Sequence, residues 1–155
     1  MSLNRLRLDD AGEALIKGFE GLRLEAYRDK GGVWTIGWGH TDRVTEDSPP
    51  ITIEEAERLF RIDIAAAEAA VNRLATVPIN QNEFNALVSF TFNEGVHRLL
   101  TSTLLLKLNR EERLAAATEF ARWIYYTDKR TNEKKKDAGL IARRAKEAAL
   151  FLTPA

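Results

Sequence analysis

The sequence contains no cysteine, which excludes disulfide bonds, thiolate catalysis and zinc sites built on cysteine. Its only two histidines, His40 and His97, are far apart and lack the helical spacing of a metal site. No apolar run is long enough for a signal-peptide core or a membrane anchor. We therefore expect no metal, no cofactor and no membrane anchor, and a chain that stays in the cytoplasm where it is made.

What is present is an ordinary globular composition, with 155 residues of which 45% are hydrophobic and 30% charged. The net charge is zero but unevenly distributed, because residues 101–155 carry 12 basic and 7 acidic side chains, a net +5. Such a segment can attract an anionic polymer, although charge alone does not identify which one.

The stretch from Phe19 to Thr41, FEGLRLEAYRDKGGVWTIGWGHT, contains the candidate chemistry. A helical pattern from about Asp10 should end at Gly21, in the left-handed position that glycine favours, which places Glu20 in the last turn. A carboxylate there faces the negative end of the helix dipole. The negative end of the helix dipole and desolvation both favour the protonated carboxyl group, which is the form that a general acid requires.

A hairpin is predicted next, because Ala26–Asp29 and Val33–Gly39 flank the turn sequence Lys30-Gly31-Gly32. Asp29 ends the first arm and Thr35 lies within the second. Two carboxyl groups and a nearby hydroxyl are suited to hydrolysing a glycosidic bond with water.

The spacing of Glu20, Asp29 and Thr35, followed by Ile-Gly-Trp-Gly-His, closely resembles the catalytic motif of phage-type (T4-lysozyme-like) endolysins, glycoside hydrolase family 24. The resemblance implies that Glu20 is the general acid and that Asp29 and Thr35 position the attacking water. It also implies that His40 is a structural hydrogen-bond partner, although a proton-transfer role stays open.

The family resemblance implies an α+β, mainly α, lysozyme-like fold in a single domain spanning residues 1–155. A small N-terminal lobe (about 1–55) would carry the catalytic hairpin, a long helix (52–76) would connect the lobes, and residues 77–155 would form a helical lobe. Periodicity alone supports the long helix, with a capping box from Thr52 and Glu55 and an end before Pro78.

Further helices are predicted over residues 80–95, from Ser102 or Thr103 to Leu108, from Asn109 to Trp123, and over 140–152. The aromatic cluster Trp123, Tyr125 and Tyr126 is interpreted as core, with sugar stacking as the alternative. Residues 128–139, including Lys134–Lys136, are predicted to be an exposed loop. The last helix is expected to bury one apolar face: Leu140, Ile141, Ala145, Ala148, Ala149 and Leu152.

Phe92-Asn93-Glu94-Gly95 and Gly139-Leu-Ile-Ala-Arg-Arg also resemble the endolysin pattern. By that resemblance Asn93 and Glu94 lie near the cleft and Arg144 reaches Glu20. Without it, Asn93 and Glu94 are a cap or solvated residues, and Arg144 forms a surface ion pair with Glu147.

The implied function is hydrolysis of the β-1,4 bond between N-acetylmuramic acid and N-acetylglucosamine in bacterial peptidoglycan, by a monomer that a holin releases into the periplasm. The alternatives are a lytic transglycosylase and a non-catalytic cell-wall-binding module. Nucleic acid is not the expected partner, because the aromatic residues precede the lysines instead of alternating with them.

Overall fold

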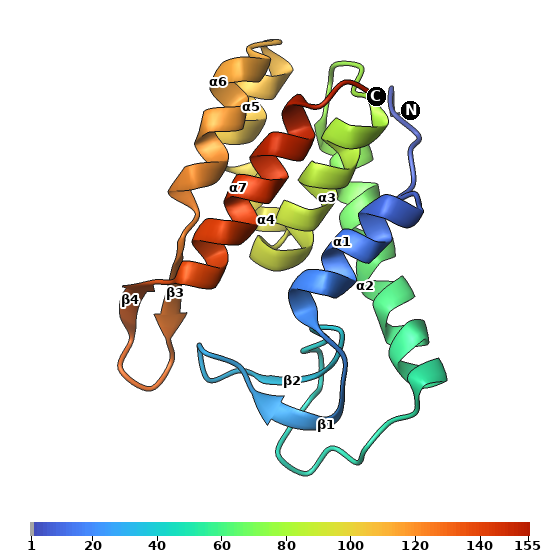
Figure 1. The fold of residues 1–155 in the computed structure, drawn as a ribbon, viewed down its shortest axis with the longest axis vertical. Coiled ribbons are helices and arrows are strands. Elements are labelled where there is room, and N and C mark those ends of the chain that lie inside the picture. Colours follow the sequence, from blue (N-terminus) through green and yellow to red (C-terminus); the bar gives the residue numbers. More distant parts are fainter. Residues whose placement is uncertain (1) are drawn as a thin grey trace.

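The computed structural model describes residues 2–155 and has a mixed, mainly helical fold (Figure 1). Its elements, in chain order, are α1 (Asp10–Glu20), β1 (Arg23–Arg28), β2 (Trp34–Gly37), α2 (Ile53–Leu74), α3 (Gln81–Glu94), α4 (Val96–Leu100), α5 (Thr103–Asn109), α6 (Arg113–Glu119), the 3-10 helix η1 (Phe120–Arg122), β3 (Tyr125–Asp128), β4 (Glu133–Lys136) and α7 (Ala138–Leu152). The predicted fold class is confirmed. No helix among residues 2–155 has both the length and the apolar character that a membrane crossing requires.

Helix α1 begins after Asp9, whose side chain accepts a 2.9 Å hydrogen bond from the amide of Gly12. It ends at Gly21 as predicted, with the positive φ of 70° that favours glycine, but ψ is 153°, far from the value of a left-handed helical residue. Strands β1 and β2 then pair antiparallel, with Tyr27 opposite Thr35. The first strand starts at Arg23, three residues before the predicted hairpin arm.

Helix α2 extends from the β1–β2 hairpin to the helical part of the molecule (Figure 1). The Thr52 hydroxyl accepts from the Glu55 amide at 3.1 Å, but the Glu55 carboxylate pairs with Arg58, so only half of the predicted capping box forms. The reciprocal capping box occurs instead at the start of α3, between Asn80 and Glu83.

Helix α3 lies at the centre of the helical part, and every residue from Glu83 to Thr91 is buried. The core around it includes large side chains from several helices: Ile16, Phe60, Ile64, Phe84, Phe90, Leu104, Leu108, Phe120 and Phe151. Close packing of this kind fixes the positions of α1, α3 and α7, whose neighbouring ends carry the site.

The predicted loop at 128–139 is wrong, because β3 and β4 form an antiparallel hairpin in which Thr127 lies opposite Lys134. Asp128 closes its turn by accepting from the Arg130 amide at 3.0 Å and from the side chains of Arg130 and Lys135. The three lysines of β4 are exposed, as predicted.

The predicted helix from Asn109 to Trp123 is also wrong at both ends. Asn109 is the last residue of α5, where its amide group bonds Leu74 and Thr76 at the end of α2. Of the three aromatic residues assigned to the core, Trp123 packs edge-to-face on Phe90, whereas Tyr125 lies on β3 and is 49% exposed.

The predicted buried face of α7 is incorrect. The buried residues are Arg143, Arg144, Glu147 and Phe151, whereas Ile141 and Leu152 are 43% and 48% exposed. Three charged side chains can be buried here because they form ion pairs and hydrogen bonds with one another and with α3. A pattern based on hydrophobicity alone therefore selects the wrong face.

Candidate active site

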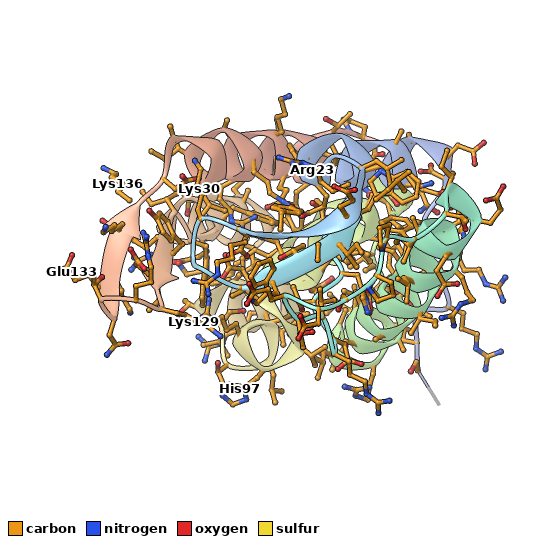
Figure 2. All side chains as sticks on the ribbon, turned by 90° about the horizontal axis from the view of Figure 1, so that it is seen from below. Arg23, Lys30, His97, Lys129, Glu133 and Lys136 are labelled. Atoms are coloured by element: carbon orange, nitrogen blue, oxygen red, sulfur yellow. The ribbon has the colours of Figure 1, made fainter. Side chains whose placement is uncertain are left out.

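The two hairpins face each other across a cleft of about 660 Å³ that α1, α3 and α7 also line. Of the residues predicted for the site, Glu20, Asp29, Asn93 and Glu94 line this cleft. Thr35, His40 and Arg144 are not among its lining residues, so the structure groups four of the seven on one surface. Figure 2 shows Arg23 and Lys30, two further cleft residues, along the side of the β1–β2 hairpin.

Glu20 is the last residue of α1, and its side chain is 18% exposed. One carboxylate oxygen accepts a hydrogen bond from Arg143, and the other lies against the backbone of Gly39. A Cβ at Gly39 would lie 2.6 Å from this oxygen, and Gly39 has φ +79°. Glycine at position 39 therefore allows the carboxylate to sit against the end of the hairpin.

Arg143, and not the predicted Arg144, reaches Glu20. Successive residues on a helix point about 100° apart, so the two arginines contact different neighbours. Arg144 instead donates to Glu94 at 2.8 Å, to the Trp123 carbonyl at 2.8 Å and to Asn93. Arg144 also pairs with Glu147, which was the alternative to a contact with Glu20, but the pair is buried and not at the surface.

Several contacts hold Arg143 in place in the wall of the cleft. Its guanidinium donates to Glu147 at 3.2 Å and to the Ser89 carbonyl at 3.1 Å, and lies 4.6 Å from the centre of the Phe19 ring. The sequence offered one signal for Arg143, its spacing of four residues from Glu147, which equals one helical turn. Both arginines are spaced to pair with Glu147, so this signal does not distinguish them.

Asp29 stands at the end of the first hairpin arm and is exposed to solvent. One of its carboxylate oxygens accepts from the Val33 amide at 2.8 Å, which ties the side chain to the turn. Within residues 2–155 this is the only hydrogen bond to the Asp29 side chain, and no cation pairs with it. The second oxygen is therefore available to a water molecule.

Thr35 lies in β2 and is 3% exposed. Its hydroxyl donates to the Val33 carbonyl at 2.9 Å, which leaves the oxygen as an acceptor. Val33 thus bonds both Asp29 and Thr35, through its amide and its carbonyl respectively.

Tyr27 is a cleft residue that the sequence argument did not single out. It lies opposite Thr35 in the strand register. Burial raises the pKa of its phenol, and the carboxylates of Glu20 and Asp29 raise that pKa further. The phenol of Tyr27 therefore lies within electrostatic range of both carboxylates, and it stays protonated as a hydrogen-bond donor.

His40 is buried, and its Nδ1 lies 2.8 Å from the Asp63 carboxylate on α2. Its backbone exchanges two hydrogen bonds with Ile36. These contacts tie the end of β2 to α2 and suit the structural role predicted for His40.

Asn93 and Glu94 end α3 at the cleft wall, and both accept hydrogen bonds from Arg144. Glu94 also pairs with Arg98 at 2.7 Å. Within residues 2–155 no group of three or more histidine and acidic side chains is arranged to hold a metal ion. The carboxyl groups that line the cleft are those of Glu20, Asp29, Glu94 and Asp137.

Known proteins that are similar to this chain in sequence or structure include endolysins and a muramidase domain. The sequence profile of the family described as "Phage lysozyme" matches residues 17–147. The endolysin of Acyrthosiphon pisum secondary endosymbiont phage 1 is 42% identical over 94% of this chain and 98% of its own.

Two solved structures are also similar. The muramidase domain of SpmX from Asticaccaulis excentricus superposes with a TM-score of 0.84 and 39% identity over 97% of this chain and all of that domain. The endolysin from Escherichia coli O157:H7 phage FAHEc1 superposes with a TM-score of 0.85 and 36% identity, over 98% of this chain and 96% of its own.

Proposed function

The chain belongs to the phage lysozyme family, and from this premise we propose that it hydrolyses the β-1,4 bond between N-acetylmuramic acid and N-acetylglucosamine in bacterial peptidoglycan. An endolysin activity, that of a lysozyme-type glycosidase acting on the cell wall, follows from the family. The bond and the residue roles are our proposal, and the observation that carries them is that Glu20 and Asp29 line one cleft from different elements.

Glu20 acts as the general acid that protonates the leaving oxygen. Its side chain is mostly shielded from solvent, and Arg143 and Gly39 fix its orientation. A proton donor held in a fixed position is what cleavage of a glycosidic bond requires.

Asp29 acts as the base that activates the attacking water, and the Thr35 oxygen accepts one of the water's hydrogen bonds. Asp29 suits this role because it lines the cleft, is exposed to solvent and has no ion-pair partner among residues 2–155. If water attacks directly, the anomeric configuration inverts, and the two carboxyl groups should be roughly 6.5–9.5 Å apart.

The proposed setting is that of a phage lysis enzyme. The protein would act as a monomer, without a cofactor, on peptidoglycan reached from the host cytoplasm through a holin-formed opening. His40, Asn93, Glu94 and Arg144 would support the site by holding its walls, without contacting the reacting atoms.

Glu20→Gln tests the proposed acid. The substitution keeps the size of the side chain but removes the proton donor, so lysis of chloroform-treated Gram-negative cells should slow by about 100-fold or more. Turbidity loss measures this rate. Glu25→Gln is the matched control, because Glu25 is an exposed carboxylate on β1 outside the cleft lining, and it should lyse cells at the wild-type rate.

Equal lysis by wild type and Glu20→Gln would refute the acid role, whereas no lysis by either would favour a wall-binding module. Mass spectrometry of digested peptidoglycan distinguishes the other alternative. Hydrolysis predicts reducing muramic acid ends, and anhydro-muramic ends would identify a lytic transglycosylase.

A further inference from the structure

Strand β3 supplies part of the cleft wall from an aromatic sequence that the proposed mechanism does not use. Its residues Tyr125, Tyr126 and Thr127 line the cleft. Of the two strands in this hairpin, β3 is the one nearer to β1 and β2 (Figure 1). The cleft wall that faces the β1–β2 hairpin therefore contains two tyrosine side chains.

The aromatic side chains of the cleft differ in what covers their rings. They are Phe19, Tyr27, Tyr125 and Tyr126. The guanidinium carbon of Arg143 lies 4.6 Å from the centre of the Phe19 ring, and that of Arg23 lies 4.6 Å from the centre of the Tyr27 ring. A cation over the face of a ring occupies surface that a ligand would contact. Two of these rings therefore already have a partner.

Tyr125 is the ring that remains available to a ligand. The residue is 49% exposed, and its side chain makes no hydrogen bond, ion pair or ring contact with the rest of residues 2–155. Tyr126, by contrast, is half-buried and lies near the cations of Lys30 and Arg130. A tyrosine side chain has a rigid ring with a polar end, and only two torsion angles become fixed when it binds a ligand. Tyr125 therefore offers a rigid aromatic surface in the cleft.

The backbone around Tyr125 is held in place. Just before it, Trp123 packs edge-to-face on Phe90, with the ring centres 5.4 Å apart. The Asp137 amide donates to the Ile124 carbonyl at 2.9 Å, and Tyr125 itself is paired with β4. The ring is thus presented by fixed backbone, which suits a binding residue because little further ordering is needed when a ligand binds.

A second hollow of about 330 Å³ adjoins the cleft at Tyr125. Arg98, Tyr125 and Thr127 line both the cleft and this hollow. Glu20 and Asp29 line the cleft but are not among the residues of the hollow. Tyr125 therefore lies at a border of the cleft, and a sugar on its ring would be outside the bond that Glu20 and Asp29 are proposed to cleave.

A glycan strand presents surfaces that match such a ring. Each pyranose ring in a β-1,4 chain has C–H groups on its two faces and polar groups at its edge. The face of an aromatic ring is negative and attracts the positive hydrogen of a C–H group. We propose that Tyr125 is a substrate-binding residue that stacks on an N-acetylhexosamine ring of the strand, outside the pair of sugars that is separated. This inference rests on the proposed glycosidase function and adds a sugar subsite on β3 to it.

Two substitutions separate the ring of Tyr125 from its other properties. Tyr125→Ile removes the ring but keeps an apolar side chain that favours a strand, whereas Tyr125→Phe keeps the ring and removes the hydroxyl. The substrate is a peptidoglycan tetrasaccharide without stem peptides, so that only sugar contacts are measured. Tyr125→Ile should raise KM roughly 3- to 10-fold, the range of an aromatic contact, and change kcat less than twofold. Tyr125→Phe should keep KM within twofold of the wild type.

Leu114→Ala is the matched control for the loss of an exposed apolar side chain. Leu114 is 74% exposed on α6 and is not among the residues that line the cleft or the second hollow. Its KM and kcat should equal those of the wild type. An unchanged KM in Tyr125→Ile would overturn the proposal. So would an equal rise of KM in both Tyr125 variants, which would assign the effect to the hydroxyl, or a fall in kcat at constant KM.

Proton NMR detects the stacked sugar without turnover. When the tetrasaccharide binds Glu20→Gln, the C–H protons of one sugar ring should shift upfield because they lie over the aromatic ring, and the ring protons of Tyr125 should shift as well. The upfield shift of the sugar protons should disappear in Glu20→Gln/Tyr125→Ile and persist in Glu20→Gln/Tyr125→Phe. Ring protons of Tyr125 that do not respond to the tetrasaccharide would contradict the subsite without any substitution at position 125.

Failure of the proposed function gives a different result. In that case the wild type would leave the tetrasaccharide intact, and the same NMR titration of the wild type would still report whether a sugar stacks on Tyr125. If instead the wild type hydrolyses the tetrasaccharide and Tyr125→Ile has the same KM and the same sugar shifts, the glycosidase function stands and the subsite on β3 is refuted.

Discussion

At the scale of single residues, Gly39 has the clearest effect on the geometry of the site. Its positive φ and its contact with the Glu20 carboxylate both depend on the absence of a side chain. Glu20 also receives a hydrogen bond from Arg143, so it is held from two sides. The position of the proposed acid thus depends on two residues that belong to other elements.

Gly39→Ala should therefore displace Glu20. We expect an activity loss of up to about 100-fold, because a misplacement of about 1 Å can cost that much. The strained φ should also lower the free energy of unfolding by about 1–2 kcal/mol. Lysis rates and urea unfolding measure the two effects.

Gly18→Ala is the matched control, because a Cβ at Gly18 meets no atom within 4 Å and the residue lies in α1. This substitution should raise stability by about 0.5–1 kcal/mol and leave lysis unchanged. Full activity in Gly39→Ala would show that the contact with Glu20 does not position the carboxylate.

At the scale of elements, the contact between α3 and α7 is made by buried charges. Glu147 is fully buried and accepts from Ser89, Arg143 and Arg144. The same charges hold the arginine that reaches Glu20, so the packing of these two helices and the geometry of the site have a common basis.

Glu147→Gln should lower the free energy of unfolding by about 3–5 kcal/mol, because it removes the buried carboxylate that two buried guanidinium groups share and leaves Arg143 with Glu20 and Arg144 with Glu94 as their remaining acidic partners. Urea unfolding measures this change. Glu55→Gln removes an exposed partner of Arg58 and should cost no more than about 1 kcal/mol. Similar losses in the two variants would contradict the role assigned to the buried network.

The β3–β4 hairpin should be sensitive to acid. The hydrogen bond from the Arg130 side chain lowers the pKa of Asp128 from 3.8 to about 2. A lowered pKa means that the stabilisation is complete above about pH 4 and disappears as the pH falls towards 2. The protection factor of the Arg130 amide, which is its exchange rate compared with that of an unstructured peptide at the same pH, should therefore fall over this range. Asp128→Asn should remove that pH dependence, and an unchanged protection factor from pH 5 to 2 would contradict the assignment.

Most elements could be predicted from the sequence because they depend on local signals. Asp10–Glu20, Ile53–Leu74 and Gln81–Glu94 have regular apolar spacing and recognisable caps or terminating glycines. The β3–β4 hairpin could not be predicted, because its polar sequence carries no alternation. The buried face of α7 was mispredicted because charged residues occupy it.

At the scale of the whole molecule, the cleft depends on contacts between distant parts of the sequence. Glu20 and Arg143 are 123 positions apart, and Lys30 and Asp137 are 107 apart. The spacing within one motif can mark Glu20, Asp29 and Thr35 as candidate site residues. It cannot show which arginine contacts Glu20, or that the two hairpins contact each other. Those facts follow from how α3 and α7 dock on the rest of the fold.

The central claim is that Glu20 and Asp29 act from opposite sides of one cleft, as acid and water base. Proton NMR of the first products from a peptidoglycan tetrasaccharide tests it most directly, because the anomeric signal records the side from which water attacks. We predict the α-anomer as the first product of the β-linked substrate, followed by slow mutarotation. A first product in the β configuration would contradict the account.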